Sequence, residues 1–97
     1  MAKVEIVGDT RLPREEVRIA VASAVKSRLG EIDESIERLE KSLKGYEANY
    51  NVSTLEFIKK YTVGELPENL DYMEWKASKE ILDDLLGERA LLGEVVT

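Results

Sequence analysis

The strongest constraint on this chain is a heptad pattern of apolar residues in its first half. The apolar positions alternate between steps of four and three residues for more than three heptads. They are Val25, Leu29, Ile32, Ile36, Leu39, Leu43, Tyr46 and Tyr50. This spacing is typical of a helix that packs in a coiled coil. The pattern therefore predicts one long amphipathic helix.

We expect this helix to span residues 13–50. Pro13 suits the first helical position because its missing N–H would have no partner there. Gly30 lies inside the pattern and costs about 1 kcal/mol relative to alanine in a helix. A turn at Gly30, with Asp33 as a new cap, is the alternative. The apolar pattern keeps its phase through Gly30, which favours a continuous helix.

A short second helix is expected over residues 54–63. Ser53 and Glu56 have the spacing of a capping box, and Val52 and Phe57 lie where a hydrophobic staple places them. The expected apolar face consists of Leu55, Phe57, Ile58 and Tyr61.

A third helix is expected over residues 68–92. Gly64 suits the end of the helix before it, and Asn69 suits the start of this one. Gly93 is expected to end it. Its apolar residues include Tyr72, Met73, Trp75, Ala77, Ile81, Leu82, Leu85, Leu86 and Leu92.

These elements predict a single all-α domain over residues 1–97. The expected fold is a long helical hairpin, or antiparallel coiled coil, with a short middle helix. Residues 1–12 read as an extended segment or a short strand, because Val4 and Ile6 alternate with charged residues.

Composition narrows the chemistry that a chain like this can perform. The sequence contains no cysteine and no histidine, which excludes disulfides, thiolate nucleophiles, histidine acid–base catalysis and the usual zinc sites. No apolar stretch approaches the roughly 18 residues of a membrane span, and the N-terminus does not read as a signal peptide. We therefore expect a cytoplasmic protein without a catalytic, cofactor or metal site.

The long helix also makes a prediction about assembly. Thirty-eight residues would extend about 57 Å, whereas a compact chain of this size has a radius of gyration of about 12–13 Å. Apolar surface would remain for another chain, so we expect a homodimer. Its seam would consist of Val25, Leu29, Ile32, Ile36 and Leu39. A break at Gly30 would instead give a monomeric bundle.

Charge is unevenly distributed along the chain. Arg11, Arg14 and Arg18 share one helix face; we interpret this as a solvated or salt-bridging face rather than a nucleic-acid site. Residues 31–50 contain six acidic and three basic residues, and residues 51–97 contain ten and five, a net charge of −8. This excess favours a basic partner.

Two carboxylate clusters are the only candidates for catalysis. Glu34, Glu37 and Glu40 repeat at three-residue steps, and Glu80 and Asp83 repeat the step later. All-helical, Mg²⁺-dependent nucleotide pyrophosphatases of the MazG type use such pairs on facing helices. Here the gap between the clusters is longer than in that family, and basic residues lie among the first three acids. Ion pairing on a solvent face is the simpler interpretation.

The second half of the chain resembles a family of small helical proteins of archaea and bacteria. The residues that carry the resemblance are Tyr50-Asn51-Val52-Ser53-Thr54-Leu55-Glu56-Phe57, Gly64-Glu65-Leu66-Pro67, Asp71-Tyr72 and Glu74-Trp75. The likeness covers residues 45–90. Some members are antitoxin-like partners of small toxin proteins. The resemblance implies a helical interaction protein and carries over no catalytic residue.

We therefore expect a non-enzymatic protein–protein interaction module, the antitoxin-like component of a two-protein pair. The expected contact surface is the last helix. Its apolar anchors would be Trp75, Leu82, Leu85 and Leu92, with Glu80, Asp83 and Asp84 at the rim. The alternatives are a MazG-like pyrophosphatase and a self-assembling helical scaffold.

Overall fold

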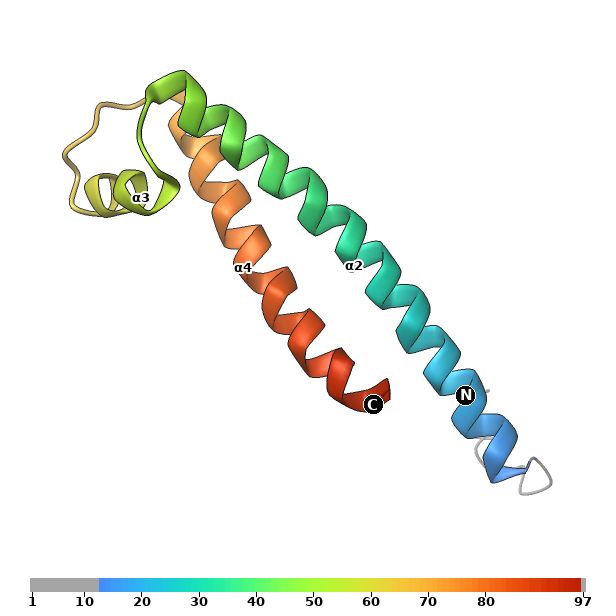
Figure 1. The fold of residues 1–97 in the computed structure, drawn as a ribbon. Helices are drawn as coiled ribbons and strands as arrows, with labels where there is room; N and C mark the ends of the chain where they lie inside the picture. Colours follow the sequence, from blue (N-terminus) through green and yellow to red (C-terminus); the bar gives the residue numbers. More distant parts are fainter. Residues whose placement is uncertain (1–12, 97) are drawn as a thin grey trace.

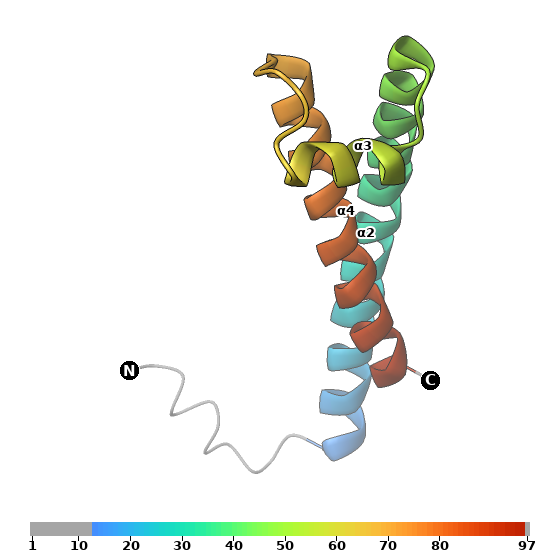
Figure 2. The same ribbon diagram turned by 90° about the vertical axis from the view of Figure 1, so that its left-hand side faces the viewer.

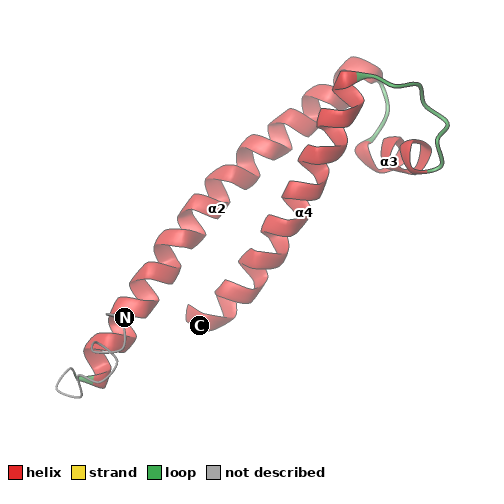
Figure 3. Ribbon diagram, turned by 180° about the vertical axis from the view of Figure 1, so that it is seen from behind, coloured by secondary structure: helices red, strands yellow, loops and turns green. Residues whose placement is uncertain are grey.

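The computed structural model describes residues 13–96, which form three helices: α2 (Arg14–Tyr50), α3 (Thr54–Thr62) and α4 (Leu70–Val96). Helix α4 returns along α2, and α3 lies beside the closed end of this hairpin (Figure 1). Two connections join the helices at that end (Figure 3). The predicted all-α hairpin with a short middle helix is confirmed. The expected N-terminal segment over residues 1–12 lies outside the described residues.

The hairpin is elongated. Its extents are 61 × 27 × 17 Å, and its radius of gyration is 20.0 Å, well above the roughly 12–13 Å of a compact chain of this length. Helix α2 passes through Gly30 and Gly45 without a break, so the alternative of a turn at Gly30 is wrong. It ends at Asn51, whose φ of 55° is left-handed, a conformation that asparagine tolerates better than most residues.

Helix α3 is held at both ends by capping contacts. The Ser53 hydroxyl accepts a hydrogen bond from the backbone N–H of Glu56 at 3.1 Å, which confirms the predicted N-cap. At the other end Gly64 has a φ of 78°. The Gly64 N–H donates to the Tyr61 carbonyl, and the Glu65 N–H donates to the Lys60 carbonyl. This pair of bonds is a Schellman motif, which requires a residue that adopts positive φ readily.

Helix α4 begins where it was expected but ends later. The Asn69 side-chain oxygen accepts from the Asp71 N–H at 2.7 Å, as a cap should. The expected end at Gly93 is wrong, because the helix continues to Val96. An interior glycine costs only about 1 kcal/mol, and the neighbouring Leu92 is half-buried, so packing at the last turns offsets that cost.

The heptad face of α2 is covered by α4 of the same chain. Ile32 has no exposed surface and Leu43 is 8% exposed, and Ile36 and Leu39 pack against the core cluster. The stretch expected to form a dimer seam (Val25, Leu29, Ile32, Ile36 and Leu39) is thus half-buried or buried within the hairpin. The heptad face of α2 is covered within the chain because α4 is long enough to supply the partner helix that the heptad pattern predicts.

Most of the core lies at the closed end, where α3 crosses in front of the two long helices (Figure 2). The ring of Phe57 stacks on Trp75 with centroids 3.9 Å apart and planes 3° apart. Tyr46 stacks on Trp75 at 5.4 Å. The Trp75 indole N–H donates to the Thr54 hydroxyl at 3.0 Å. Leu55, which was expected on the apolar face of α3, is 66% exposed, because Phe57 fixes which face of α3 points inward.

We predict that Ser53→Ala lowers the free energy of unfolding by about 1 kcal/mol, because it removes the side-chain acceptor at the start of α3. Urea denaturation followed by circular dichroism measures this. The matched control is Ser27→Ala on the exposed surface of α2. Equal effects of the two substitutions would contradict the capping role.

We also predict that Ile32→Asp unfolds the chain instead of separating folded subunits. It places an unpaired charge at a fully buried position, at a cost of several kcal/mol, comparable with the roughly 5–15 kcal/mol stability of a small domain. Ile19→Asp, at a position 54% exposed on the same helix, should remain helical by circular dichroism. A folded, helical Ile32→Asp monomer would overturn this account of the seam.

Candidate functional site

The residues expected to bind a partner do not share one exposed surface in the structure. Trp75 and Leu82 are 0% and 6% exposed and lie in the chain's own core, so the expectation that they contact a partner is wrong. Leu85 and Leu92 are half-buried. The three rim residues, Glu80, Asp83 and Asp84, are exposed as expected.

A second row of apolar residues runs along α4 on the side away from its buried residues. Its large members are Leu70, Met73, Ile81, Leu91 and Val95, which are 51–69% exposed. Positions three or four residues apart share one face of a helix, and Ala77 continues the row between Met73 and Ile81. We call this row, with the acidic residues that lie along it, the outer strip.

The charged residues of the outer strip are all acidic. They are Glu80 and Asp84, whereas Glu74 accepts a hydrogen bond from the Tyr46 hydroxyl and Glu88 pairs with Arg28, both on α2. The three basic residues of α4 are paired: Lys76 with Glu80 of the strip, Lys79 with Asp83 at 2.9 Å, and Arg89 with Asp33 of α2. The hydrogen bond to Glu80 raises the pKa of Lys76. The strip therefore combines exposed apolar side chains with negative charge, an arrangement suited to a basic amphipathic segment.

Two of the residues expected to contact a partner, Trp75 and Leu82, lie on the buried face of α4, whereas the exposed apolar row lies on another face. The sequence of α4 contains two apolar rows, one on each of these faces. One row contains Trp75, Leu82 and Leu85 and matches the heptad face of α2, whereas the other contains Met73 and Ile81, which are 56% and 51% exposed. Both rows have helical spacing, so periodicity alone does not say which one is buried.

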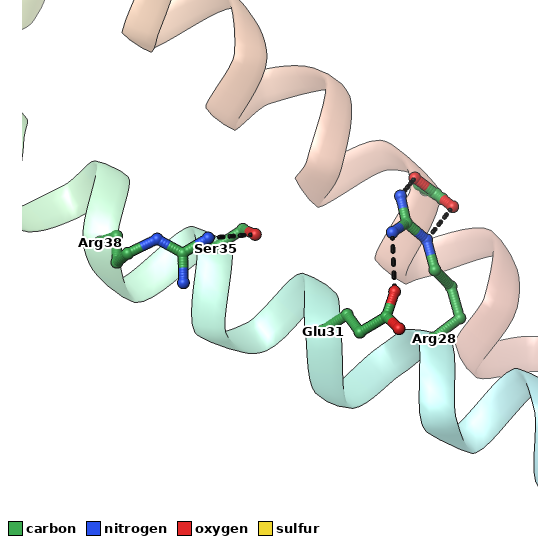
Figure 4. A network of polar contacts seen from close by, with 5 residues as sticks. Arg28, Glu31, Ser35 and Arg38 are labelled. Carbon is green, nitrogen blue, oxygen red and sulfur yellow. Dashed lines mark hydrogen bonds and ion pairs between the residues drawn. The ribbon is translucent and has the colours of Figure 1, made fainter.

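A groove of about 530 Å³ lies between α2 and α4 beside the outer strip. It is lined by Arg28, Ser35, Arg38, Leu39, Ser42, Ile81 and Leu85. The guanidinium of Arg38 donates to the Ser35 hydroxyl at 2.9 Å (Figure 4). The groove is open; its α2 side is polar apart from Leu39, and its α4 side is apolar.

Arg28 ties the two helices together at the end of this groove (Figure 4). Its guanidinium donates to both carboxylate oxygens of Glu88 at 2.9 and 3.0 Å and to Glu31 at 3.2 Å. These bonds raise the pKa of Arg28 and lower the pKa of Glu88. The groups are exposed, so the pairs fix the register of the hairpin more than they add to its stability.

A smaller hollow of about 280 Å³ lies at the closed end. It is lined by Tyr50, Asn51, Val52, Phe57, Lys60, Leu66, Tyr72 and Trp75. The Tyr50 hydroxyl donates to the Asp71 carboxylate at 2.6 Å, and this bond raises the pKa of Tyr50. The hollow is thus bounded by residues that already pack in the aromatic core.

The acidic clusters considered for catalysis do not form a metal-binding group. Among residues 13–96, no three or more acidic side chains are placed so that they could hold a metal ion. Glu80 and Asp83 are each bonded to a lysine one turn earlier. Of the basic face, Arg11 lies outside the described residues, and Arg18 pairs with Glu15, in keeping with a salt-bridging face. No helix in the described range has an apolar stretch long enough to cross a membrane.

Comparisons of the chain with protein-family models, with curated proteins and with solved structures find no match.

A carboxylate of α2 makes a pH-sensitive contact with α3. Glu47 accepts a hydrogen bond from the backbone N–H of Thr54 at 2.8 Å, and this bond lowers the pKa of Glu47. A lowered pKa in the folded state stabilises the fold above the unfolded-state pKa of about 4.3, and the contribution is lost as the pH falls through the lower folded value.

We predict that Glu47→Gln is less stable than the wild type at pH 7 and that the difference shrinks between pH 5 and pH 3. The glutamine oxygen still accepts the bond, but without the charge that strengthens it. Denaturant midpoints measured across this range provide the test, with Glu37→Gln on the exposed side of α2 as the control. A difference that does not change with pH would count against the contact.

Proposed function

We propose that this chain is a non-enzymatic interaction module, the antitoxin-like component of a two-protein pair, which binds a basic protein along the outer strip of α4. The observation that carries the proposal is the combination of exposed apolar residues with the acidic residues Glu80 and Asp84 on one face of α4. In this proposal the pair acts in the cytoplasm.

The dimensions of the outer strip suit a helical partner. The strip runs from Leu70 to Val95, about 38 Å at 1.5 Å per residue. An amphipathic helix binds such a surface with anchors at three- and four-residue steps. Basic residues beside those anchors would face Glu80 and Asp84, so opposite charges would speed and orient docking.

The fold supports this role because it orders the outer strip before a partner binds. The opposite side of α4 carries Trp75 and Leu82, both buried against the rest of the chain. Arg28 and Asp33 of α2 pair with Glu88 and Arg89 near the far end of α4. A partner would therefore lose little binding energy to ordering the strip.

The alternatives have less support. A MazG-like pyrophosphatase needs carboxylates on facing helices that converge on Mg²⁺, and no such group exists among residues 13–96. A self-assembling scaffold would account for exposed apolar residues, but like-charged acidic strips would repel one another. No specific observation favours either one.

The test uses the protein encoded by the neighbouring reading frame, which this proposal requires to be small and basic. We predict that the two proteins bind and that Met73→Asp weakens the binding at least about tenfold by burying a charge among apolar anchors. Isothermal titration calorimetry on purified proteins measures this. The matched control is Leu55→Asp, on α3 at a position 66% exposed, which should bind as the wild type does.

Charge reversal distinguishes a specific contribution of the acidic residues beside the strip from the effect of the chain's overall negative charge. Asp84→Lys should slow association and weaken its dependence on salt, whereas Glu34→Lys on the exposed side of α2 should not. If the neighbouring protein does not bind, or if Met73→Asp and Leu55→Asp behave alike, the outer strip is not the partner surface. The antitoxin-like role further requires that the neighbour inhibits growth when expressed alone and not together with this chain.

A further inference from the structure

The groove between α2 and α4 adjoins the outer strip. Ile81 belongs to the strip and also lines the groove, and Leu85, one turn later, continues the apolar side of the groove. Because successive residues of a helix are turned by about 100°, Leu85 lies about 40° from Ile81 on the side toward α2, whereas Asp84 lies about 60° from it on the other side. The strip therefore has one edge at the groove and another edge, with Glu80 and Asp84, away from it.

The groove edge carries positive charge. The residues that line the groove include Arg28 and Arg38 but no aspartate or glutamate. Glu88 and Glu31 bond to Arg28. The guanidinium of Arg38 donates to the uncharged hydroxyl of Ser35 (Figure 4), and it pairs with no carboxylate in the part of the chain that the structure describes. Because a guanidinium stays charged and has more N–H donors than one hydroxyl occupies, Arg38 can still bind a carboxylate.

We propose that the partner places an acidic side chain in this groove, where its carboxylate bonds to Arg38. This inference rests on the proposed function and specifies the charge pattern of the partner. The partner's helix has basic residues on one flank of its apolar row, which face Glu80 and Asp84, and an acidic residue on the other flank, which faces Arg38. Charge-assisted hydrogen bonds of this kind are roughly twice as strong as neutral ones.

The groove has room for such a side chain and suitable groups to contact it. Its volume of about 530 Å³ is many times the roughly 30 Å³ that a water molecule occupies in the liquid. The Ser42 hydroxyl, which also lines the groove, offers a second donor to the carboxylate. Leu39 and Leu85 lie where they would contact the methylene carbons of a glutamate.

Opposite charges on the two edges of the strip also fix the direction of the partner's helix. An apolar row alone would accept a helix that runs either way along α4. A helix that ran the wrong way would exchange its flanks, so its acidic residue would face Glu80 and Asp84 and its basic residues would face Arg38. Such contacts between like charges are strongly unfavourable, so one direction is selected.

Charge reversal at Arg38 tests this contact, with the purified neighbouring protein as the probe. The control is Lys26→Glu, which changes the net charge by the same amount as Arg38→Glu and lies on the opposite side of α2 from Ser35. Both positions are exposed, so circular dichroism should show unchanged helix content.

The contact and the overall charge of the chain predict opposite results for Arg38→Glu. Overall charge predicts that both variants, being more acidic, bind a basic partner at least as tightly as the wild type does. A carboxylate at Arg38 predicts instead that Arg38→Glu weakens binding at least about tenfold, whereas Lys26→Glu does not weaken it. Isothermal titration calorimetry measures both.

Exchange of charges between the two proteins identifies the acid. Each acidic residue of the neighbouring protein is replaced in turn by arginine, and each variant is titrated against the wild type and Arg38→Glu. One of them should bind Arg38→Glu at least about threefold more tightly than it binds the wild type, because the exchange restores the pair. The same variant should not prefer Lys26→Glu in this way.

Three results would overturn the inference while the proposed function stands. They are binding that Met73→Asp weakens but Arg38→Glu does not, equal weakening by Arg38→Glu and Lys26→Glu, and a set of partner variants in which none prefers Arg38→Glu. A neighbouring protein that does not bind the wild type would contradict the proposed function itself, and this inference with it.

Discussion

The packing of Trp75 is the interaction on which the rest of this structure depends. Its indole is fully buried, stacks on Phe57 of α3 and Tyr46 of α2, and donates to the Thr54 hydroxyl. All three helices thus meet at one side chain. Because Trp75 belongs to the second turn of α4, its burial fixes the rotation of α4 about its axis. That rotation decides which apolar row of α4 faces α2 and which faces outward.

The distribution of charge follows from this rotation. The basic residues of α4 pair with acids beside them or on α2, whereas the exposed acid Asp84 lies along the outward row. One helix therefore has an apolar face that stabilises the hairpin and an acidic, apolar face that is exposed. In the first turns of α2, Val17 and Val21 are about half exposed.

Much of the fold is readable from the sequence because its signals are local. The heptad steps from Val25 to Tyr50 require a long helix, Ser53 and Glu56 mark the start of the next, and Gly64 supplies the positive φ that ends it. Gly93 did not predict the end of α4 correctly, because the free-energy cost of a glycine inside a helix is small compared with the packing of its neighbours.

The site was less readable because it depends on tertiary contacts. Trp75 was expected to be an interface anchor, as large aromatic residues on amphipathic helices often are. In the structure it is buried, because it donates a hydrogen bond to Thr54 and stacks on Phe57. Met73 and Ile81 were expected to widen one apolar row, whereas they form a second one. Likewise, the heptad face of α2 predicted a partner helix without saying whether that helix comes from the same chain.

The central claim is that α4 covers the heptad face of α2 within one chain. Pulsed electron–electron double resonance, which measures the distance between two spin labels, tests it most directly. The labels are attached to the thiols of a Ser42→Cys/Ile81→Cys variant, because both positions line the same groove. With axes about 8–10 Å apart, the labels should lie within roughly 20 Å of each other. This short distance should persist when the labelled protein is refolded with an excess of unlabelled chain. A short distance that disappears on such dilution would show that α4 covers another copy's α2, and would contradict the account.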